Sequence, residues 1–331
     1  MTINDIKLML IFNTIIKMNY STKLHTIIDN FQTEFTLLQY NVDQSMREEA
    51  TSETKWNNRY PRVKKLIDEV NADIVCLQEM RKLPDTISVN HFLALFPQYS
   101  NILEYRNAHP LAFGQAILYK PEKFYPLQTV KRWLSETPNT VSESWTSTPS
   151  SGYIVVGTQF MPVHDTKVVV NTKPFWVFNV HFGMEEELKT RSCFKLLEIT
   201  NTIANGDEYI ISGDFNFFPD KDGSRQREIL TNELKDLGQH AHTLTGKHIE
   251  GTFVGYEHDE YKANLNHMIS RLDNVFSTNL VHGYNPTLYT KTMHYNEPIE
   301  LTTRDFPSDH LPLVINIVIK NHSHVVMKLD T

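Results

Sequence analysis

Several apolar, strand-like stretches of this chain end in a polar side chain of a type that enzymes use for catalysis. In residues 209–216, YIISGDFN, a buried strand runs into Asp214 and Asn216. Gly213 allows the backbone to turn, and residues two apart in an extended chain point to the same side. A carboxylate and a carboxamide held side by side suit a phosphate oxygen, a water molecule or a hard metal ion. An ordinary Asx turn would explain the same residues, so the segment by itself leaves both interpretations open.

The same arrangement recurs elsewhere. Asn41 lies near the end of the apolar run 36–42, Glu79 follows the run 73–77, His181 follows the run 175–180, and Asp309-His310 precede a run at 313–319. Sites are usually assembled where strand ends gather along one edge of packed sheets. Apolar spacing also predicts helices over residues 59–70 and 185–204, and further strands over residues 112–119, 153–160, 167–170, 208–212 and 271–277.

Composition restricts the class of protein. The net charge of −7 is a poor match for a protein that binds long duplex DNA nonspecifically, because such proteins use a basic face. Cys76 and Cys193 fall at apolar positions and are expected to be buried thiols, which favours a cytoplasmic or other intracellular reducing compartment. The apolar segment Ile6–Met18 is interrupted by polar residues and is too short to span a membrane; we expect an amphipathic N-terminal extension.

Six motifs occur in an order that resembles the endonuclease/exonuclease/phosphatase superfamily, the group that includes deoxyribonuclease I. They contain Asn41 in LLQYNV, Glu79 in DIVCLQE, His181 in FNVHF, Asp214 and Asn216 in SGDFN, Asp273 in RLDNVF, and Asp309-His310 in PSDHLPL. Each motif alone is weak, but six in order at strand boundaries are specific. The stretches WLSETP (133–138) and GTFVGY (251–256) are similar to a poorly characterised, largely bacterial branch of the superfamily.

The resemblance implies an α/β (α+β) fold: a four-layer sandwich of two packed mixed β-sheets flanked by helices. It covers residues 36–320, which leaves residues 1–35 as an N-terminal extension and residues 321–331 as a C-terminal tail.

The resemblance also implies hydrolysis of a phosphoester with Mg²⁺ or Mn²⁺. Asn41, Glu79 and Asp309 are the expected metal ligands, and oxygen ligands of this kind are those that Mg²⁺ prefers. The resemblance pairs His310 with Asp309 and His181 with Asp273, because a carboxylate fixes the tautomer of a histidine and raises its basicity. Asp214 would then orient or deprotonate the attacking water, and Asn216 would hold a phosphate oxygen.

Other residues are more ambiguous. Phe253 could stack on a base or sugar, or pack in the core; Arg271 could contact substrate, or pair with Asp273. Trp133 and Trp145 flank a Ser/Thr/Pro-rich stretch, residues 135–151, which is expected to be a long loop near the site. Basic residues that could line a groove are Lys131, Arg132, Arg225, Arg227 and Arg271.

Three functions compete. The first is a metal-dependent phosphodiesterase, most simply a nuclease, that uses in-line attack by water; the acidic balance favours short or single-stranded substrates over extended duplex. The second is a phosphomonoesterase acting on inositol, sugar or lipid phosphates, which the same residues would serve. The third is a catalytically inactive binding module, which the intact set of acids and histidines argues against. A phosphoester, and nucleic acid before a small ester, is the expected partner; the motifs specify no oligomeric state.

Overall fold

The structure is a computed structural model. It describes residues 24–29, 32–44, 54–81, 87–109, 111–145, 152–163, 173–217, 223–239, 242–243, 251–253, 255, 271–288, 307–320 and 324–329.

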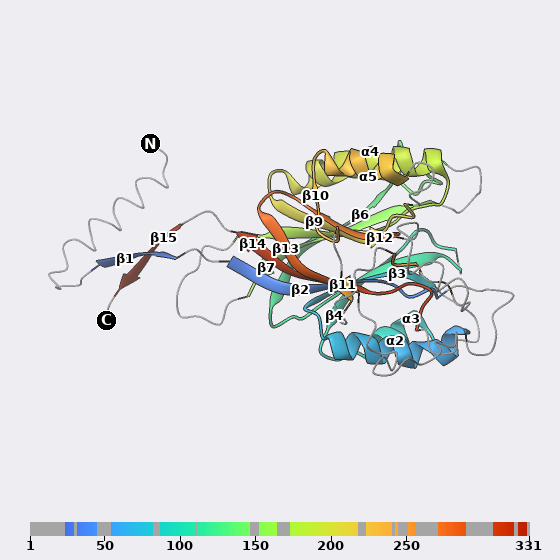
Figure 1. The fold of residues 1–331 in the computed structure, drawn as a ribbon, viewed down its shortest axis with the longest axis horizontal. Coiled ribbons are helices and arrows are strands. Elements are labelled where there is room, and N and C mark those ends of the chain that lie inside the picture. The colour runs from blue at the N-terminus through green and yellow to red at the C-terminus, as the bar shows by residue number, and fades with distance from the viewer. Residues whose placement is uncertain are drawn as a thin grey trace.

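Two mixed β-sheets pack face to face (Figure 1). In the described part of the chain, one sheet has six strands in the spatial order β10 (Lys235–Asp236), β12 (Asp273–Ser277), β9 (Glu208–Asp214), β8 (Phe175–His181), β7 (Ile154–Pro162) and β6 (Phe124–Trp133). The other has seven described strands in the order β11 (His242–Thr243), β13 (Val281–Leu288), β14 (Leu313–Lys320), β2 (Gln32–Asn41), β3 (Ile74–Arg81), β5 (Phe113–Tyr119) and β4 (Ser100–Tyr105).

Helices cover the outer face of each sheet, which gives four layers (Figure 1). α2 (Trp56–Val70) and α3 (Val89–Ala94) pack on the seven-stranded sheet, and α4 (Glu186–Ala204) and α5 (Gly223–Thr231) pack on the six-stranded sheet. α2 connects the parallel pair β2–β3, and α4 connects the parallel pair β8–β9. The four-layer α/β sandwich predicted from the sequence is therefore confirmed.

The space between the sheets changes from apolar to polar along the strands. In β2, Phe35 and Leu37 belong to the apolar cluster between the sheets, whereas Gln39 and Asn41 continue the same face with buried amides. β8 repeats the pattern, because Val177 faces that cluster and is followed on the same face by buried Asn179 and His181. Residues i, i+2 and i+4 of a strand share a face, so each central strand carries its polar residues to one end of the sandwich.

Some predicted elements differ from those observed. β2 begins at Gln32, before the predicted boundary at residue 36, and β4, β6, β13, α3 and α5 were not predicted. β1 (Leu24–Asp29) and β15 (His324–Leu329) form an antiparallel pair that joins the expected N-terminal extension to the C-terminal tail. The predicted elements at residues 6–18 and 167–170 lie outside the described residues. Cys76 and Cys193 are buried free thiols, as expected.

Candidate active site

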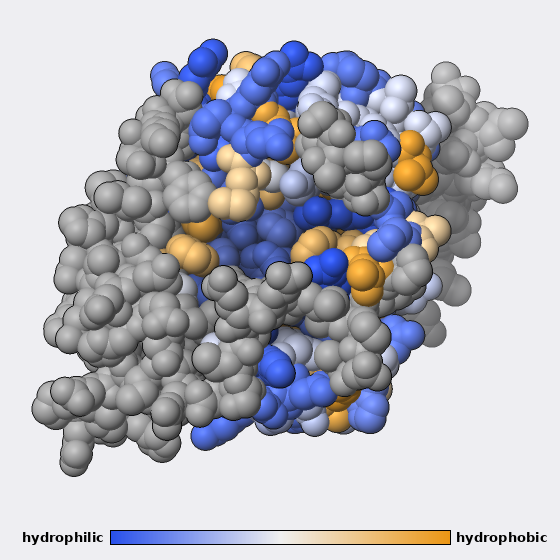
Figure 2. Space-filling view, turned by 90° about the vertical axis from the view of Figure 1, so that its right-hand side faces the viewer, coloured by the Kyte–Doolittle hydropathy of each residue, from blue (hydrophilic) through white to orange (hydrophobic). Residues whose placement is uncertain are grey.

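A hollow with a hydrophilic floor opens on the face of the molecule seen in Figure 2, which is the side towards which β2 runs in Figure 1. The strand ends expected to form a site meet at this end of the sandwich. The two central parallel pairs deliver one residue each from their four strands: Asn41 from β2, Glu79 from β3, His181 from β8 and Asp214 from β9. Ligand sites commonly form outside the carboxyl ends of parallel strands, and the observed arrangement follows that rule.

Three residues of the site have left-handed backbone conformations. The φ angles are 47° at Asp43, 58° at Glu79 and 52° at Asn216. Such values are uncommon outside glycine, and they cluster where a fold holds functional side chains. At Glu79 the pairing of β3 with β5 also shifts register, between Leu77 and Met80. The irregular backbone turns the Glu79 carboxylate away from the alternation of the strand and towards the site.

The side chain of Asn41 links the two sheets. Its Nδ2 donates to Oε1 of Glu79 at 3.0 Å and to Oδ2 of Asp214 at 2.9 Å. Its Oδ1 accepts the backbone N–H of Asp43 at 3.0 Å, which closes an Asx turn after β2. Asn41 therefore brings a carboxylate of each sheet into one cluster.

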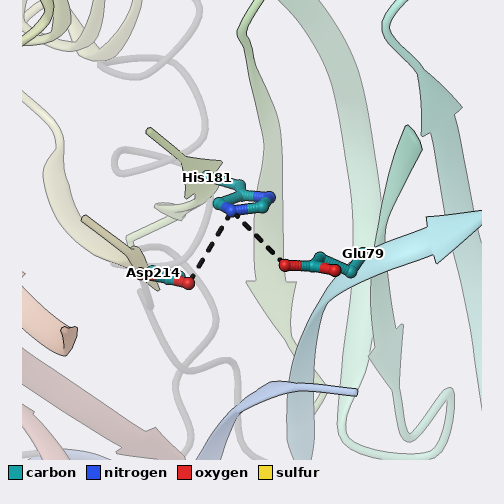
Figure 3. A group of neighbouring side chains, drawn as sticks. All are labelled: Glu79, His181 and Asp214. Carbon is teal, nitrogen blue, oxygen red and sulfur yellow. Dashed lines mark ion pairs between the residues drawn. The ribbon is translucent and has the colours of Figure 1, made fainter. Parts of the chain in front are cut away.

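His181 points between Glu79 and Asp214 (Figure 3). Its Nε2 lies 3.8 Å from Oε1 of Glu79 and 3.7 Å from Oδ2 of Asp214. On the other side of the ring, Nη2 of Arg106 lies 3.2 Å from Nδ1. A guanidinium can only donate hydrogen bonds, so Nδ1 is the acceptor and Nε2 carries the proton. Burial, with the positive charges of Arg106 and His310, lowers the pKa of His181 well below its ordinary value, and the imidazole is neutral.

His310 pairs with Asp273, which corrects the predicted pairings. Nδ1 of His310 lies 2.7 Å from Oδ2 of Asp273, whereas Nε2 of His310 and Oδ1 of Asp309 are 4.0 Å apart. The prediction that Asp273 serves His181 was wrong, because the short antiparallel ladder between β12 and β9 puts Asp273 opposite Asp214 and within reach of His310. Burial alone would lower the pKa of His310, but the adjacent carboxylates hold it well above the ordinary value. His310 is therefore an imidazolium.

Carboxylates crowd the centre of the site. Burial, followed by the charges of Asp43 and Asp309, raises the pKa of Glu79 to about 8. Burial, with the charge of Asp273, raises the pKa of Asp214 to about 6 although His310 opposes the shift. Within the described residues, two groups of side-chain atoms lie within 4.8 Å of one another, one from Glu79, His181 and Asp214 and one from Asp214, Asp273 and His310. Such a cluster of buried acids is what a bound cation would relieve.

Asn216 is held by its surroundings. Its backbone N–H donates to Oδ1 of Asp214 at 2.9 Å, and its Nδ2 donates to the carbonyl of Phe182 at 2.8 Å. The fully buried Lys189 of α4 donates to the carbonyl of Asn216 at 2.9 Å. The turn after β9 is thus both an Asx turn and part of the cluster, so the two interpretations of its sequence are compatible.

Phe253 and Arg271 contact the protein itself. Phe253 forms an isolated bridge with His310, and the two rings meet edge to face with centroids 5.2 Å apart. Nη2 of Arg271 lies 2.5 Å from Oδ1 of the buried Asp236, so its partner is not Asp273. Arg227 binds the same carboxylate at 2.8 Å. Phe253 supports the His310 ring, and Arg271 supports the sheet behind it.

Three residues close to the site were not singled out in the sequence. Arg106 follows β4 directly, just as Asn41 stands at the end of β2. It was not predicted because β4 has too weak an apolar pattern to be recognised as a strand. Asp43 lies two residues after Asn41, on the turn that Asn41 caps. The buried guanidinium of Arg59 donates to the carbonyls of Val42 and Pro307 at 3.0 and 2.7 Å. It thereby joins the segment that carries Asp43 to the segment that carries Asp309.

Trp133 also has a defined role beside the site. It is a core residue, and its indole Nε1 donates to the carbonyl of Arg106 at 3.0 Å. Trp145, further along the expected loop, donates to Oε1 of Glu136 at 3.1 Å. Residues 134–145 form no helix or strand, and residues 146–151 lie outside the described part. The WLSETP segment therefore fixes the backbone that presents Arg106 to His181.

The chain matches the sequence profile of the endonuclease/exonuclease/phosphatase family over residues 38–310. The chain belongs to this family. The match covers every strand end that contributes to the site. Membership and fold support a divalent-metal-dependent hydrolase of phosphoesters. Among the described residues, no helix combines the length and apolar character needed to cross a membrane.

Similar proteins come from a giant virus and from bacteria. The uncharacterized protein L388 of Acanthamoeba polyphaga mimivirus is 29% identical over 288 residues, which is 84% of this chain and 98% of L388. The family protein from Bacteroides vulgatus shares 21% identity with a TM-score of 0.68, covering 87% of this chain and 100% of its own. The mannosyl-6-phosphatase Bt3783 of Bacteroides thetaiotaomicron shares 23% identity with a TM-score of 0.65, covering 86% and 99%. The two bacterial structures share the fold of this chain.

Proposed function

We propose that this protein is a Mg²⁺- or Mn²⁺-dependent phosphodiesterase that cleaves short or single-stranded nucleic acid by in-line attack of water. The observation that carries the proposal is the convergence of two imidazoles on one carboxylate. Nε2 of His181 and Nε2 of His310 each lie 3.7 Å from Oδ2 of Asp214. A phosphate bound over this point would meet the Asp214 carboxylate, which can orient the attacking water and accept its proton. It would also meet two imidazole N–H groups that can stabilise its oxygens.

The donor set fits a hard divalent cation. Glu79, Asn41 and Asp309 are the proposed ligands. Asn41 would turn its amide to offer Oδ1 to a cation, because in this structure its Nδ2 faces Glu79 and Asp214. Asp43 adds a negative charge that acts on Glu79. Their carboxylate and amide oxygens are the atoms that Mg²⁺ and Mn²⁺ prefer. The raised pKa of Glu79 is independent support, because it results from burial and from like charges that a cation would compensate. A cation at these ligands would stabilise negative charge on the phosphate oxygens.

The remaining residues have separate roles in the proposed reaction. Asp214 orients the attacking water and accepts its proton, for which a pKa raised to about 6 is suited. His181 donates Nε2–H to a non-bridging oxygen, since Arg106 occupies its Nδ1. His310, charged and held by Asp273, stabilises the pentacovalent phosphorus. The second amide proton of Asn216 would bind a phosphate oxygen, because the first is used by Phe182.

The basic residues argue for a short substrate. Lys131 pairs with Glu104 at 2.7 Å, and Arg227 and Arg271 both pair with Asp236. These three cations stabilise the protein itself and contribute little to a groove for duplex phosphates. With a net charge of −7, this favours substrates recognised at the scissile phosphate over those held along a long backbone.

A phosphomonoesterase remains the second candidate, because the fold of this chain is similar to that of a bacterial mannosyl-6-phosphatase. The two activities separate in one assay. Purified protein with Mg²⁺ or Mn²⁺ should cleave bis(p-nitrophenyl) phosphate and a single-stranded oligonucleotide faster than p-nitrophenyl phosphate and mannose 6-phosphate. Faster turnover of the two monoesters would assign the protein to the phosphatases instead.

Substitution of Glu79 tests the metal assignment. Glu79→Gln should lower kcat/KM for the diester at least about a hundredfold, since charge stabilisation by a cation amounts to several kcal/mol. Glu34→Gln is the matched control, because Glu34 is an exposed carboxylate on β2. Equal activity of the two variants would show that Glu79 is not a ligand that the reaction requires.

A further inference from the structure

We propose that Gln39 is a positioning residue for this reaction, because its side-chain amide holds the carboxylate of Asp273 in the orientation that engages His310. The inference rests on the proposed function, which gives His310 and Asp273 their roles. Gln39 is fully buried, and it precedes Asn41 by two residues on the same face of β2. It belongs to a layer of amides that separates the apolar interior from the site.

The hydrogen bonds of this layer have a fixed direction, which is set by two backbone carbonyls. Nδ2 of Asn179 lies 3.0 Å from the carbonyl of Leu77 and 2.9 Å from that of Ala116. Carbonyl oxygens only accept, so the Asn179 side chain must point its NH₂ group at them. Both of its amide protons are then used, and its Oδ1 faces the next amide as an acceptor.

The orientation of the Asn179 amide fixes that of Gln78, and Gln78 fixes that of Gln39. Nε2 of Gln78 donates to Oδ1 of Asn179 at 2.7 Å and to Oε1 of Gln39 at 2.9 Å. Oε1 of Gln39 also accepts the hydroxyl of Ser212 at 2.7 Å. With its oxygen placed in this way, Gln39 turns its NH₂ group towards Oε1 of Gln78 and Oδ1 of Asp273, the latter at 3.1 Å. Both amide protons of Gln39 are therefore used.

The consequence for Asp273 is that its two oxygens have different partners. Oδ1 receives an amide proton from Gln39, and Oδ2 is left for Nδ1 of His310 at 2.7 Å. The backbone N–H of Asp273 donates to the hydroxyl of Thr252 at 2.9 Å. Gln39 on one oxygen and His310 on the other therefore fix the plane of the carboxylate. This plane in turn fixes the direction in which Nε2 of His310 points.

Packing alone does not require polar residues in this layer. Two residues earlier on the same faces, β2 and β8 fill the space between the sheets with Leu37 and Val177. Replacing a hydrogen-bonded pair by apolar groups of similar shape is often nearly neutral for stability. An amide network whose orientation is fixed at carbonyls, and which ends at the carboxylate that holds His310, is better explained by positioning.

Two substitutions of Gln39 test the proposal in the full-length protein. Gln39→Met keeps the length of the side chain and removes its donors and acceptors. Gln39→Leu also removes the donors and acceptors, with a shorter and branched side chain, and likewise has no proton for Asp273. Both should lower kcat about tenfold or more with KM changed less than about twofold, the magnitude typical of residues that orient a functional imidazole.

A nuclear magnetic resonance signature separates positioning from a general loss of structure. The Nδ1 proton of His310, in its hydrogen bond to Asp273, should give a low-field resonance that moves or broadens in both variants. In the wild-type protein, the Gln39 amide protons should be protected from exchange with solvent. Rapid exchange of these protons, or an unchanged His310 resonance with unchanged kcat in either folded variant, would overturn the proposal.

Gln115→Leu is the matched control. Gln115 is also buried between the sheets, where its Nε2 donates to the carbonyl of Ile154 at 3.2 Å, outside the network of Gln39. This variant should keep kcat and the His310 resonance. Failure of the proposed function would appear differently, as a wild-type protein that is inactive on every phosphoester while the resonance and the exchange protection are present.

Discussion

At the scale of single residues, the two histidines of the site are set to opposite charge states by their neighbours. His181 faces a guanidinium and is neutral, whereas His310 faces Asp273 and is protonated. One imidazole is therefore a neutral donor and the other a fixed positive charge. Pairs of titratable groups whose environments push their pKa values apart are typical of catalytic sites.

Arg106 should control the tautomer of His181. In Arg106→Leu the Nδ1 atom loses its donor, so the proton is no longer confined to Nε2, and the pKa of His181 should rise because a neighbouring positive charge has been removed. We expect kcat to fall at least about tenfold. Heteronuclear spectra of the imidazole nitrogens, recorded across pH, would report the tautomer and the pKa together.

Arg191→Leu is the control for this change. Its side chain is half exposed on α4, where it pairs with Glu187. Activity and the His181 spectrum should both remain as in the wild-type protein. An Nε2–H tautomer that persists unchanged in Arg106→Leu would show that Arg106 does not set it.

At the scale of elements, the contact between β8 and β9 decides how far His181 lies from Asp214. The two residues are opposite each other in the parallel ladder, and Gly213 lies opposite Val180. A Cβ atom on Gly213 would stand 2.2 Å from the carbonyl oxygen of Val180. Because that atom belongs to the backbone, the strands themselves must separate.

Gly213→Ala should therefore reduce both stability and activity. We expect a loss of about 2 kcal/mol in the free energy of unfolding, as for other over-packed cores, together with a fall in kcat/KM for the diester. Gly157→Ala is the matched control, because its Cβ would meet the side chain of Phe178 away from the strand ends. Denaturant unfolding and diester hydrolysis on both variants would show whether activity is lost only at Gly213.

Elements that carry the site were predictable because they are buried on both faces. β8 and β9 are almost continuous runs of apolar and β-branched residues that stop at His181 and Asp214. β4 and β6 are edge strands with mixed burial, so their sequences lack a clear period, and Arg106 was missed with β4. Residue type and position relative to a strand end were enough to select most of the cluster.

The pairing of side chains could not be predicted from the same information. Asp273 meets His310 because β12 pairs with β9 in the register that places Asp273 opposite Asp214, and the segment before β14 brings Nδ1 of His310 to 2.7 Å from its carboxylate. Register between strands distant in sequence depends on packing of the whole sandwich. The same holds for the basic residues, since Arg227 and Arg271 were candidates for a groove and instead share the buried Asp236.

At the scale of the whole molecule, the acidic cluster couples folding to pH and to cations. The pKa of Glu79 rises from an ordinary 4.5 to about 8, and a group whose pKa is raised on folding contributes stability below its unfolded pKa that is lost as pH rises. His310 has the same sign, because its pKa is also raised. His181 has the opposite sign, and its contribution is lost below about pH 6.5.

The melting temperature in the presence of a chelator should consequently fall between pH 6.5 and pH 8, the window in which His181 is neutral in both states. Mg²⁺ or Mn²⁺ should restore it, because a cation that binds only the folded protein stabilises by about 2.7 kcal/mol at a hundred times its Kd. Glu79→Gln should melt higher than the wild type at pH 8 with chelator, and should gain little from either cation. Glu34→Gln, the exposed control, should follow the wild type in every condition. The wild-type melting temperature could instead stay constant across this window and not respond to either cation. That result would show that folding does not raise the pKa of Glu79 and that the proposed residues do not bind the cation.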